Sequence, residues 1–543
     1  MTEQVSLTID GQKIQAPKGV LLIEAAKIAG IQIPHYCYHG GLPVVGSCRM
    51  CLVEIEKNPK LQPSCATPVA EGMVVRTKTP QTLQNRRSVL EFLLANHPLD
   101  CPVCDQAGEC ELQNYYMEHG LYDPRFNENK TKRKKATPLG PHIILDQERC
   151  ILCTRCVRFT RDISKTSELG VIGRGHHGAI DVMPGFELNN PYSGNLADVC
   201  PVGALTDRDF RFKCRVWFLG RTPSICPGCS RGCNIEIHFN ERFNPRYHDQ
   251  RVHRLKPRYN EAVNGHWICD EGRYAYPAID APSRLRTPLL KQGEGYQEAS
   301  WPQAMREVAG SLKQVLAAHG PQGVAVLASP QMSNEELFLV RRIFQDSLGV
   351  ENIANHVPLN EKVYSDDFLI TADKNANSRG AAVFYPPGPG NRDGARLLQD
   401  CAAGRIHFLY IFQQDLTRAY DSEYVSEALA KVECVVFQGS WDQPTAALAD
   451  IQLPAAVYAE KEGTFTNIQG RVQRFQAAVP PIGASLPDLD ILSRLALELG
   501  VSLSGTNAAA VFGEIAQTVA AFTGMTWQSV GTTGQLLVPE SGK

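Results

Sequence analysis

Residues 88–113 read SVLEFLLANHPLDCPVCDQAGECELQ, and this stretch decides how the first half of the chain is interpreted. An apolar helical segment stops at Pro98, because proline cannot continue a helix, and this leaves His97 at the C-terminal end. Three cysteines follow with the spacing C-x2-C-x5-C. One short segment therefore supplies four metal ligands: His97, Cys101, Cys104 and Cys110. We expect them to bind a [4Fe–4S] cluster, whose potential a neutral imidazole raises relative to an all-cysteine site.

Three more cysteine sets lie around this stretch, each with the ligand count and spacing of an iron–sulfur site. In chain order, the first set is Cys37, Cys48, Cys51 and Cys65; the second is the set just described; the third is Cys150, Cys153, Cys156 and Cys200; the fourth is Cys226, Cys229, Cys233 and Cys269. The sets use fifteen of the eighteen cysteines. The start of the sequence, MTEQVSLTIDG, does not have the pattern of an export signal, so we expect a reducing compartment, where so many thiols are typical of metal ligands and not of disulfides.

The first set belongs to a predicted β-grasp domain at 1–80. Alternating strands at its start precede a helical stretch, LLIEAAKIAG (21–30), and a cysteine loop then carries three of the four ligands. One loop plus one remote cysteine predicts a [2Fe–2S] cluster, and structural zinc is the alternative. The second set, with one histidine and three cysteines, defines a separate domain at 81–120.

The third set predicts a ferredoxin-like domain at 140–215 that holds one [4Fe–4S] cluster. Its first three cysteines match one C-x2-C-x2-C-x3-C-P run of a two-cluster ferredoxin, and Cys200-Pro201 matches the end of the other run. The positions that would bind a second cluster hold no thiol: Thr160, Asn190, Ser193 and Leu196. The fourth set has the spacing C-x2-C-x3-C-x35-C, in a domain at 222–278. It predicts another [4Fe–4S] cluster, with a zinc ribbon as a real competitor.

Several other features favour ordinary structural roles. We expect Cys214, Cys401 and Cys434 to be small core residues, and the basic run 130–135 to be a linker or a docking face. His176 and His177 are expected to be exposed. The loop PPGPGNRDG (386–394) lacks a dinucleotide fingerprint. A formal net charge of −2 gives no case for nucleic acid binding, and no apolar stretch is long enough to span a membrane.

Residues 279–543 have a different pattern, with apolar strands alternating with amphipathic helices. Strands are predicted at 323–329, 381–386, 406–412 and 434–440, and helices near 302–318, 334–347, 422–431 and 487–499. This alternation predicts a parallel, doubly wound α/β sheet. It shows no phosphate-binding glycine signature and no acid–base constellation, so we expect a structural role. The fold class is thus multidomain, with α+β cluster domains before an α/β domain.

The order of these modules, and above all H-x3-C-x2-C-x5-C between a [2Fe–2S] domain and a reduced ferredoxin domain, resembles the large iron–sulfur subunit (the 75 kDa type, or G-type) of respiratory complex I, NADH-quinone oxidoreductase. The segment ADIQLPAAVYAEKEGTFTNIQGRVQRF (449–475) resembles that family's C-terminal domain, which is related to molybdopterin oxidoreductases. The back half is short beside those enzymes, and GVENIANHVPLN (349–360) lacks a cysteine, selenocysteine or serine where they bind molybdenum. The resemblance therefore implies a truncated, vestigial domain without molybdenum.

The resemblance also implies a function. The chain would relay electrons from an NADH- and FMN-binding flavoprotein subunit toward quinone, with proton translocation elsewhere in the complex and no catalytic residue or substrate site of its own. Its partners would be that flavoprotein and the quinone-proximal iron–sulfur subunits, with no nucleic acid and no direct membrane span. It would lie on the cytoplasmic side of a bacterial inner membrane. The alternatives are a catalytic or iron–sulfur subunit of an NAD-linked formate dehydrogenase or hydrogenase.

Overall fold

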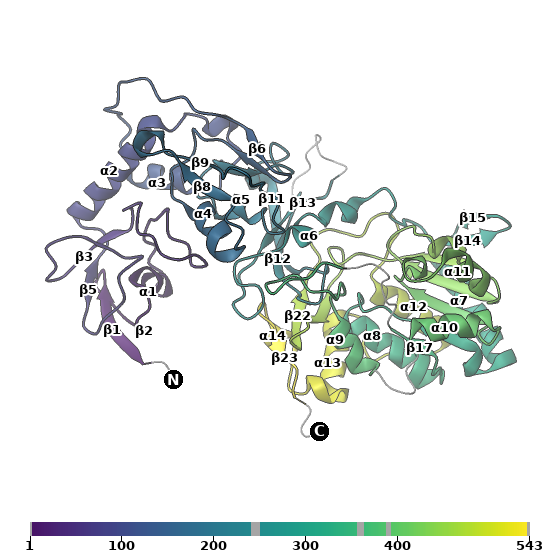
Figure 1. Cartoon of the computed structure of the whole chain (residues 1–543). Coiled ribbons are helices and arrows are strands. Elements are labelled where there is room, and N and C mark those ends of the chain that lie inside the picture. Colours follow the sequence, from purple (N-terminus) through teal and green to yellow (C-terminus); the bar gives the residue numbers. More distant parts are fainter. Residues whose placement is uncertain (1–2, 241–249, 356–362, 387–392, 540–543) are drawn as a thin grey trace. The chain divides into compact units, whose positions relative to one another are not determined.

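The computed structural model describes residues 3–240, 250–355, 363–386 and 393–539 (Figure 1). The chain divides into two compact units, Met1–Leu219 and Gly220–Lys543. Part of the segment at 349–360 and most of the loop at 386–394 lie outside the described residues. None of the described helices is both long and apolar enough to cross a membrane.

The first module is a five-stranded sheet with one helix packed on it, as predicted for a β-grasp domain. The sheet order is β2-β1-β5-β3-β4, and β1 pairs antiparallel with β2 and parallel with β5. Alternate residues of β1 and the apolar face of the helix share one core, because both patterns turn their apolar side chains to the same side. The elements are β1 (Gln4–Ile9), β2 (Gln12–Pro17), α1 (Leu22–Ile28), β3 (Leu52–Ile55), β4 (Gln62–Pro63) and β5 (Val74–Arg76).

Two helices frame the second set. Helix α2 (Pro80–Asn96) begins with Thr79 as its N-cap, whose side chain accepts the N–H of Thr82, and a proline follows at the first helical position. It ends at Asn96, so His97 occupies the C-cap as the sequence predicts. A short turn, η1 (Cys101–Val103), and helix α3 (Glu111–His119) follow.

The third module has a small sheet of order β10-β7-β6 and a separate two-stranded sheet, β8-β9. Short helical segments lie between these strands: Cys150 and Cys153 precede α4, Cys156 lies in it, and Cys200 is the C-cap of α5. The elements are β6 (Thr137–Leu139), β7 (Ile143–Leu145), α4 (Arg155–Arg158), η2 (Phe159–Ile163), β8 (Leu169–Ile172), η3 (Gly175–His177), β9 (Ala179–Val182), α5 (Asn195–Val199), β10 (Leu205–Asp207) and η4 (Val216–Phe218).

The module of the fourth set has a three-stranded sheet of order β11-β12-β13, in which β12 and β13 are antiparallel, followed by two short helical segments. These elements are β11 (Leu219–Ile225), β12 (Asn234–Asn240), β13 (Val252–Pro257), α6 (Asp270–Arg273) and η5 (Tyr276–Asp280).

The α/β body contains a seven-stranded sheet of order β15-β14-β20-β19-β18-β16-β17. Its five strands from β20 to β17 are parallel, and β14 and β15 add an antiparallel edge. The strands are β14 (Leu289–Gln292), β15 (Gly295–Glu298), β16 (Val324–Leu327), β17 (Ile353–Ala354), β18 (Phe408–Phe412), β19 (Cys434–Gly439) and β20 (Ile451–Pro454). Their apolar side chains enter two separate cores, so the predicted doubly wound sheet is confirmed.

Helices cover both faces of this sheet. One core contains residues of α7 (Trp301–His319), α8 (Asn334–Val340), α12 (Asp488–Leu499) and α13 (Ala508–Thr518), and the other contains residues of α10 (Gly394–Ala402) and α11 (Ser422–Leu429). The remaining named elements are η6 (Pro321–Gly323), η7 (Arg341–Ser347), η8 (Leu416–Arg418), η9 (Ala446–Leu448), β21 (Gly463–Thr466), β22 (Arg471–Phe475), η10 (Ala520–Phe522), α14 (Trp527–Val530) and β23 (Gln535–Leu536).

One predicted strand is wrong. Residues 381–386 belong largely to helix α9 (Ser378–Phe384), not to a strand. Gly380, Ala381 and Phe384 are the buried positions, and this spacing of one and three residues places them on one side of a helix. A short apolar run fits a buried helix and a buried strand equally well, so the sequence pattern at 381–386 does not distinguish the two.

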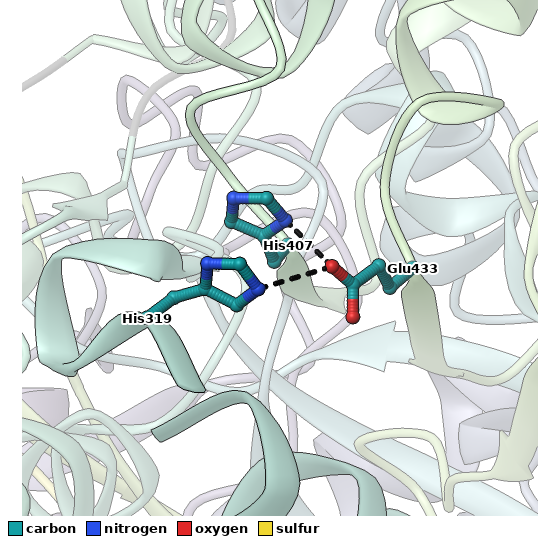
Figure 2. Close-up of side chains that lie close together, drawn as sticks. All are labelled: His319, His407 and Glu433. Atoms are coloured by element: carbon teal, nitrogen blue, oxygen red, sulfur yellow. Dashed lines mark hydrogen bonds and ion pairs between the residues drawn. The ribbon is translucent and has the colours of Figure 1, made fainter. Parts of the chain in front are cut away.

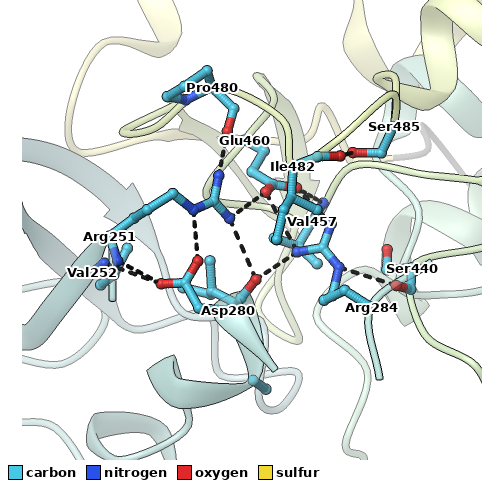
Figure 3. A network of polar contacts seen from close by, with 12 residues as sticks. Arg251, Val252, Asp280, Arg284, Ser440, Val457, Glu460, Pro480, Ile482 and Ser485 are labelled. Atoms are coloured by element: carbon cyan, nitrogen blue, oxygen red, sulfur yellow. Dashed lines mark hydrogen bonds and ion pairs between the residues drawn. The ribbon is translucent and has the colours of Figure 1, made fainter. Parts of the chain in front are cut away.

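Buried ion pairs join the fourth-set module to the α/β body within the second unit (Figure 3). Arg251 precedes β13 and binds Asp280 (Nε–Oδ1 2.6 Å) and Glu460 (Nη2–Oε1 2.6 Å). The same Glu460 carboxylate binds Arg284 through its other oxygen (2.7 Å), and both of those side chains are fully buried. The two fully buried charges, Arg284 and Glu460, are paired with each other, which is the condition for keeping ions in a protein interior.

A second buried ion network lies deeper in the body. Lys461 contacts Glu336 at 2.7 Å and Asp488 at 2.5 Å, and these carboxylates come from the first turns of α8 and α12. The same Asp488 accepts a hydrogen bond from the Gln438 amide (2.8 Å) at the end of β19. Buried charges and polar groups therefore fill the interior beside the C-terminal end of this parallel strand.

Candidate iron–sulfur cluster sites

The four sulfurs of the first set converge in the β-grasp domain. Cys37 and Cys48 lie on the loop after α1, Cys51 directly precedes β3, and Cys65 follows β4. Hydrogen bonding to the thiols of Cys48 and Cys65 lowers the pKa of Cys37, and the Cys65 thiol lowers the pKa of Cys51 to about 7. Contacts among these thiols thus favour, at Cys37 and Cys51, the thiolate form that binds iron.

The second set lines one small cavity at the end of α2. His97, Cys101, Cys104 and Cys110 all face it, together with Gln113, Arg149 and Gly203. Burial, with Arg149 and Lys130 nearby, lowers the pKa of His97 to about 4, so the imidazole is neutral at physiological pH and has a nitrogen lone pair for iron. A Cβ on Gly203 would lie 2.3 Å from the Cys104 sulfur. This position therefore requires glycine.

The third set lines a second cavity. The four cysteines line it together with Thr154, Arg155 and apolar side chains that include Leu145, Ile180 and Val202. Burial raises the pKa of Cys150 and of Cys200 to about 11, while backbone N–H groups lower both, as that of Leu152 does at Cys150. A largely apolar pocket with backbone N–H donors suits an iron–sulfur cluster.

The positions of the lost second ferredoxin cluster are filled by ordinary packing. All four of these side chains are buried: Thr160, Asn190, Ser193 and Leu196. Asn190 donates a hydrogen bond to Glu168 (2.5 Å), and the Thr160 hydroxyl donates to the Val157 carbonyl (3.2 Å). Polar and apolar contacts therefore occupy the space where a second cluster would bind.

The fourth set is buried at the start of the second unit. Cys226 directly follows β11, Cys233 directly precedes β12, and the Cys233 carbonyl accepts the Cys226 N–H at 2.9 Å. Cys269 is the N-cap of α6, and its sulfur accepts the N–H of Gly272 at 3.3 Å. A Cβ on Gly272 would lie 2.9 Å from the Cys226 sulfur and 3.5 Å from that of Cys269. Glycine lets the α6 backbone approach both sulfurs.

Two buried arginines connect the first and third sets, and sequence analysis did not identify them. The Arg158 Nη2 donates to the carbonyls of Cys37 (2.5 Å) and Cys153 (3.3 Å), which belong to different sets. Arg155 donates to the carbonyls of Tyr38 (2.6 Å) and Val199 (3.2 Å), each next to a set cysteine. Their partners on the first loop are 121 and 117 residues away in the chain. No local sequence pattern predicts contacts between residues so far apart in the chain.

The three cysteines outside the sets and the adjacent histidines His176 and His177 have the burial that the sequence predicts. Cys214, Cys401 and Cys434 are buried in apolar clusters, and His176 and His177 are exposed. In the basic run, Lys130 donates to the carbonyls of Leu94 and Ala95 at the end of α2, which ties this linker to the helix that precedes His97.

Family models match consecutive parts of the chain. A 2Fe-2S iron-sulfur cluster binding domain matches 2–80, an NADH-ubiquinone oxidoreductase-G iron-sulfur binding region matches 86–125, and an NADH-quinone oxidoreductase subunit 3 ferredoxin-like domain matches 140–206. A molybdopterin oxidoreductase Fe4S4 domain matches 220–280, and a molybdopterin oxidoreductase model matches 284–384 and 389–498.

Relatives match over nearly the whole chain. The G-type subunit of NADH-quinone oxidoreductase from Rickettsia felis is 31% identical, over 93% of this chain and 89% of the relative. The mitochondrial NADH-ubiquinone oxidoreductase 78 kDa subunit of Neurospora crassa is 33% identical, over 92% and 81%. A crystal structure of NAD+-reducing [NiFe]-hydrogenase is 32% identical over 39% of this chain and 91% of that chain, with a TM-score of 0.35 that is too low to argue a shared fold.

Proposed function

Because the chain belongs to the family of the G-type subunit of NADH-quinone oxidoreductase, we propose that its four ligand sets hold one [2Fe–2S] cluster and three [4Fe–4S] clusters. The chain is an electron-relay iron–sulfur subunit of an oxidoreductase complex. The convergence of each ligand set in the fold carries the proposal. We assign the clusters to the domains at 1–80, 81–120, 140–215 and 222–278, and none to 279–543.

The ligands of each cluster follow from the sets. Cys37, Cys48, Cys51 and Cys65 hold the [2Fe–2S] cluster. The [4Fe–4S] clusters are held by His97, Cys101, Cys104 and Cys110; by Cys150, Cys153, Cys156 and Cys200; and by Cys226, Cys229, Cys233 and Cys269. The neutral imidazole at the second set and the cavities at the second and third sets support metal binding by these residues, and the family models for iron–sulfur domains favour clusters over zinc.

The protein residues determine where the electrons travel, while bound clusters supply the one-electron chemistry. Mostly apolar walls surround the third set, and backbone N–H groups at Leu152 and Gly272 hold the sulfurs in place. Arg158 contacts backbone from two sets at once, so it fixes their separation. We assign NADH oxidation and quinone reduction to other subunits, and no catalytic residue to this chain.

The proposed partners are the NADH- and FMN-binding flavoprotein subunit and the quinone-proximal iron–sulfur subunits. Three large apolar side chains beside the second set support a subunit contact there: Phe92, Leu99 and Val103 are 81%, 87% and 60% exposed. We further propose that the complex places the chain on the cytoplasmic side of a bacterial inner membrane.

Metal analysis of the holoprotein tests this function. One [2Fe–2S] and three [4Fe–4S] clusters require about 14 iron atoms and as many acid-labile sulfides per chain. Finding about 10 iron atoms and one zinc would remove the fourth cluster from the proposal. Proteins that co-purify with the chain test the complex: membrane antiporter-like subunits support the proposal, whereas a soluble hydrogenase or formate dehydrogenase with molybdenum or tungsten would overturn it.

A further inference from the structure

A trio of potential metal ligands lies in the α/β body, far along the chain from every cysteine set. His319 is the last residue of α7, His407 directly precedes β18, and Glu433 directly precedes β19. Figure 2 shows both imidazoles pointing one nitrogen at the same carboxylate oxygen. The Glu433 Oε1 lies 3.2 Å from the His319 Nε2 and 2.8 Å from the His407 Nδ1. We propose that these three side chains form a binding site for a divalent transition-metal ion.

The parallel sheet brings the three positions together. Phe408 pairs with Cys434 and Val324 pairs with Phe408, so the residues just before these strands lie side by side at the N-terminal edge of the sheet. Backbone hydrogen bonds continue the ladder to that level: the His407 N–H donates to Gly323, and the His407 carbonyl accepts from Cys434. The strand register therefore aligns His407 with Glu433.

Gly323 provides the space for the two imidazoles. A Cβ at this position would lie 2.7 Å from the Cβ of His319 and 3.4 Å from the His407 ring. Any larger residue would push the end of α7 away from the sheet edge. The absence of a side chain at Gly323 thus lets the helix end and the strand start approach closely.

The ligand set has the chemistry of a transition-metal site. Two imidazoles and one carboxylate bind zinc in many proteins, and imidazole favours Zn²⁺, Ni²⁺ or Co²⁺ over Mg²⁺ and Ca²⁺. In a tetrahedral zinc site, bonds of about 2.0–2.1 Å place neighbouring ligand atoms about 3.3 Å apart, close to the two separations observed here. The side chains are 36%, 25% and 48% exposed for His319, His407 and Glu433, so solvent reaches a fourth coordination position.

Metal binding requires one rearrangement. The two rings stack with centroids 3.6 Å apart and planes 7° apart, and an ion cannot lie in both of two parallel planes. The rings must tilt toward each other around the ion, and their partial exposure leaves room for this movement. The bound ion then ties the end of α7 to the starts of β18 and β19.

The test uses the cluster-loaded chain under anaerobic conditions and Zn²⁺ as the probe. We expect about one equivalent of zinc beyond the cluster iron after equilibrium dialysis, and its loss in the double variant His319→Ala/His407→Ala. Glu433→Gln should keep the fold and weaken zinc binding at least about tenfold. The matched control is His176→Ala/His177→Ala, which removes another close histidine pair, with centroids 3.7 Å apart, from the exposed η3 segment.

X-ray absorption at the zinc edge separates this site from vacant cysteine sites. Nitrogen and oxygen neighbours without sulfur support the proposal, whereas sulfur neighbours would show that zinc sits in an unfilled cysteine set. The proposal is overturned if the wild-type chain binds no extra zinc, or if the His319/His407 variant binds as much zinc as the wild type. Iron content is unaffected by either result, so the four-cluster assignment is judged separately.

Discussion

Replacing Arg158 by methionine removes a buried positive charge from between the first and third ligand sets. The Arg158 Nη2 lies 2.5 Å from the carbonyl oxygen of Cys37 and 3.3 Å from that of Cys153. If the charge is about 7 Å from each cluster centre and the effective dielectric constant is ~20, it stabilises an added electron on the cluster by about 2.4 kcal/mol. For a one-electron couple this corresponds to about 100 mV. Arg158→Met should therefore lower both cluster potentials by up to about that amount.

The assay is a redox titration of the holoprotein followed by electron paramagnetic resonance. Arg161→Met is the matched control, because Arg161 is exposed, lies in the next helical turn and pairs with Asp162 (2.8 Å). It should leave both potentials nearly unchanged, since exposed charges are screened by solvent. Arg158→Lys keeps the charge, so its cluster potentials should stay close to those of the wild-type protein. Unchanged potentials in Arg158→Met, with full cluster content, would refute the electrostatic reasoning. Equal decreases in potential in Arg158→Met and Arg158→Lys would show that the hydrogen bonds of the guanidinium, and not its charge, cause the effect.

Single substitutions elsewhere in the chain should have equally local effects. His97→Cys should keep the second cluster but lower its potential by roughly 100 mV, because a thiolate adds negative charge; an unchanged titration curve would place the fourth ligand elsewhere. Gly272→Ala should damage the fourth cluster, since its Cβ would lie 2.9 Å from the Cys226 sulfur, whereas Gly228→Ala, at 3.6 Å, should be tolerated; iron analysis of both variants decides. Burial raises the pKa of Glu335 from 4.5 to about 7. Between these two pH values the folded state keeps a proton that the unfolded state has released, so the free energy of unfolding falls as the pH rises through this window. Glu335→Gln should remove about 3 kcal/mol of that pH dependence, measured by thermal unfolding below and above the window, and an unaltered slope would contradict it.

The cysteine sets and most of the fold were predictable from sequence for a local reason. Ligands such as Cys150, Cys153 and Cys156 are held close by the chain itself, so their spacing in sequence restricts their spacing in space. The same holds for His97, because Pro98 stops α2 directly after it. The alternation of apolar strand segments with amphipathic helical segments likewise predicted β16, β18 and β19. The short apolar run at 381–386 was misassigned, because burial there follows from packing against α8 and not from its own periodicity.

The sequence by itself therefore determined which residues are candidate iron ligands, the order of the modules and the class of the C-terminal body. Only the tertiary structure decided that Arg158 contacts two sets, that glycine is needed at Gly272, and that His319, His407 and Glu433 meet at one sheet edge. These contacts join positions far apart in the chain, through strand register and close backbone approach. Covalent spacing restricts neighbours within a few residues, whereas long-range proximity is set by the packing of whole elements, which no short pattern encodes.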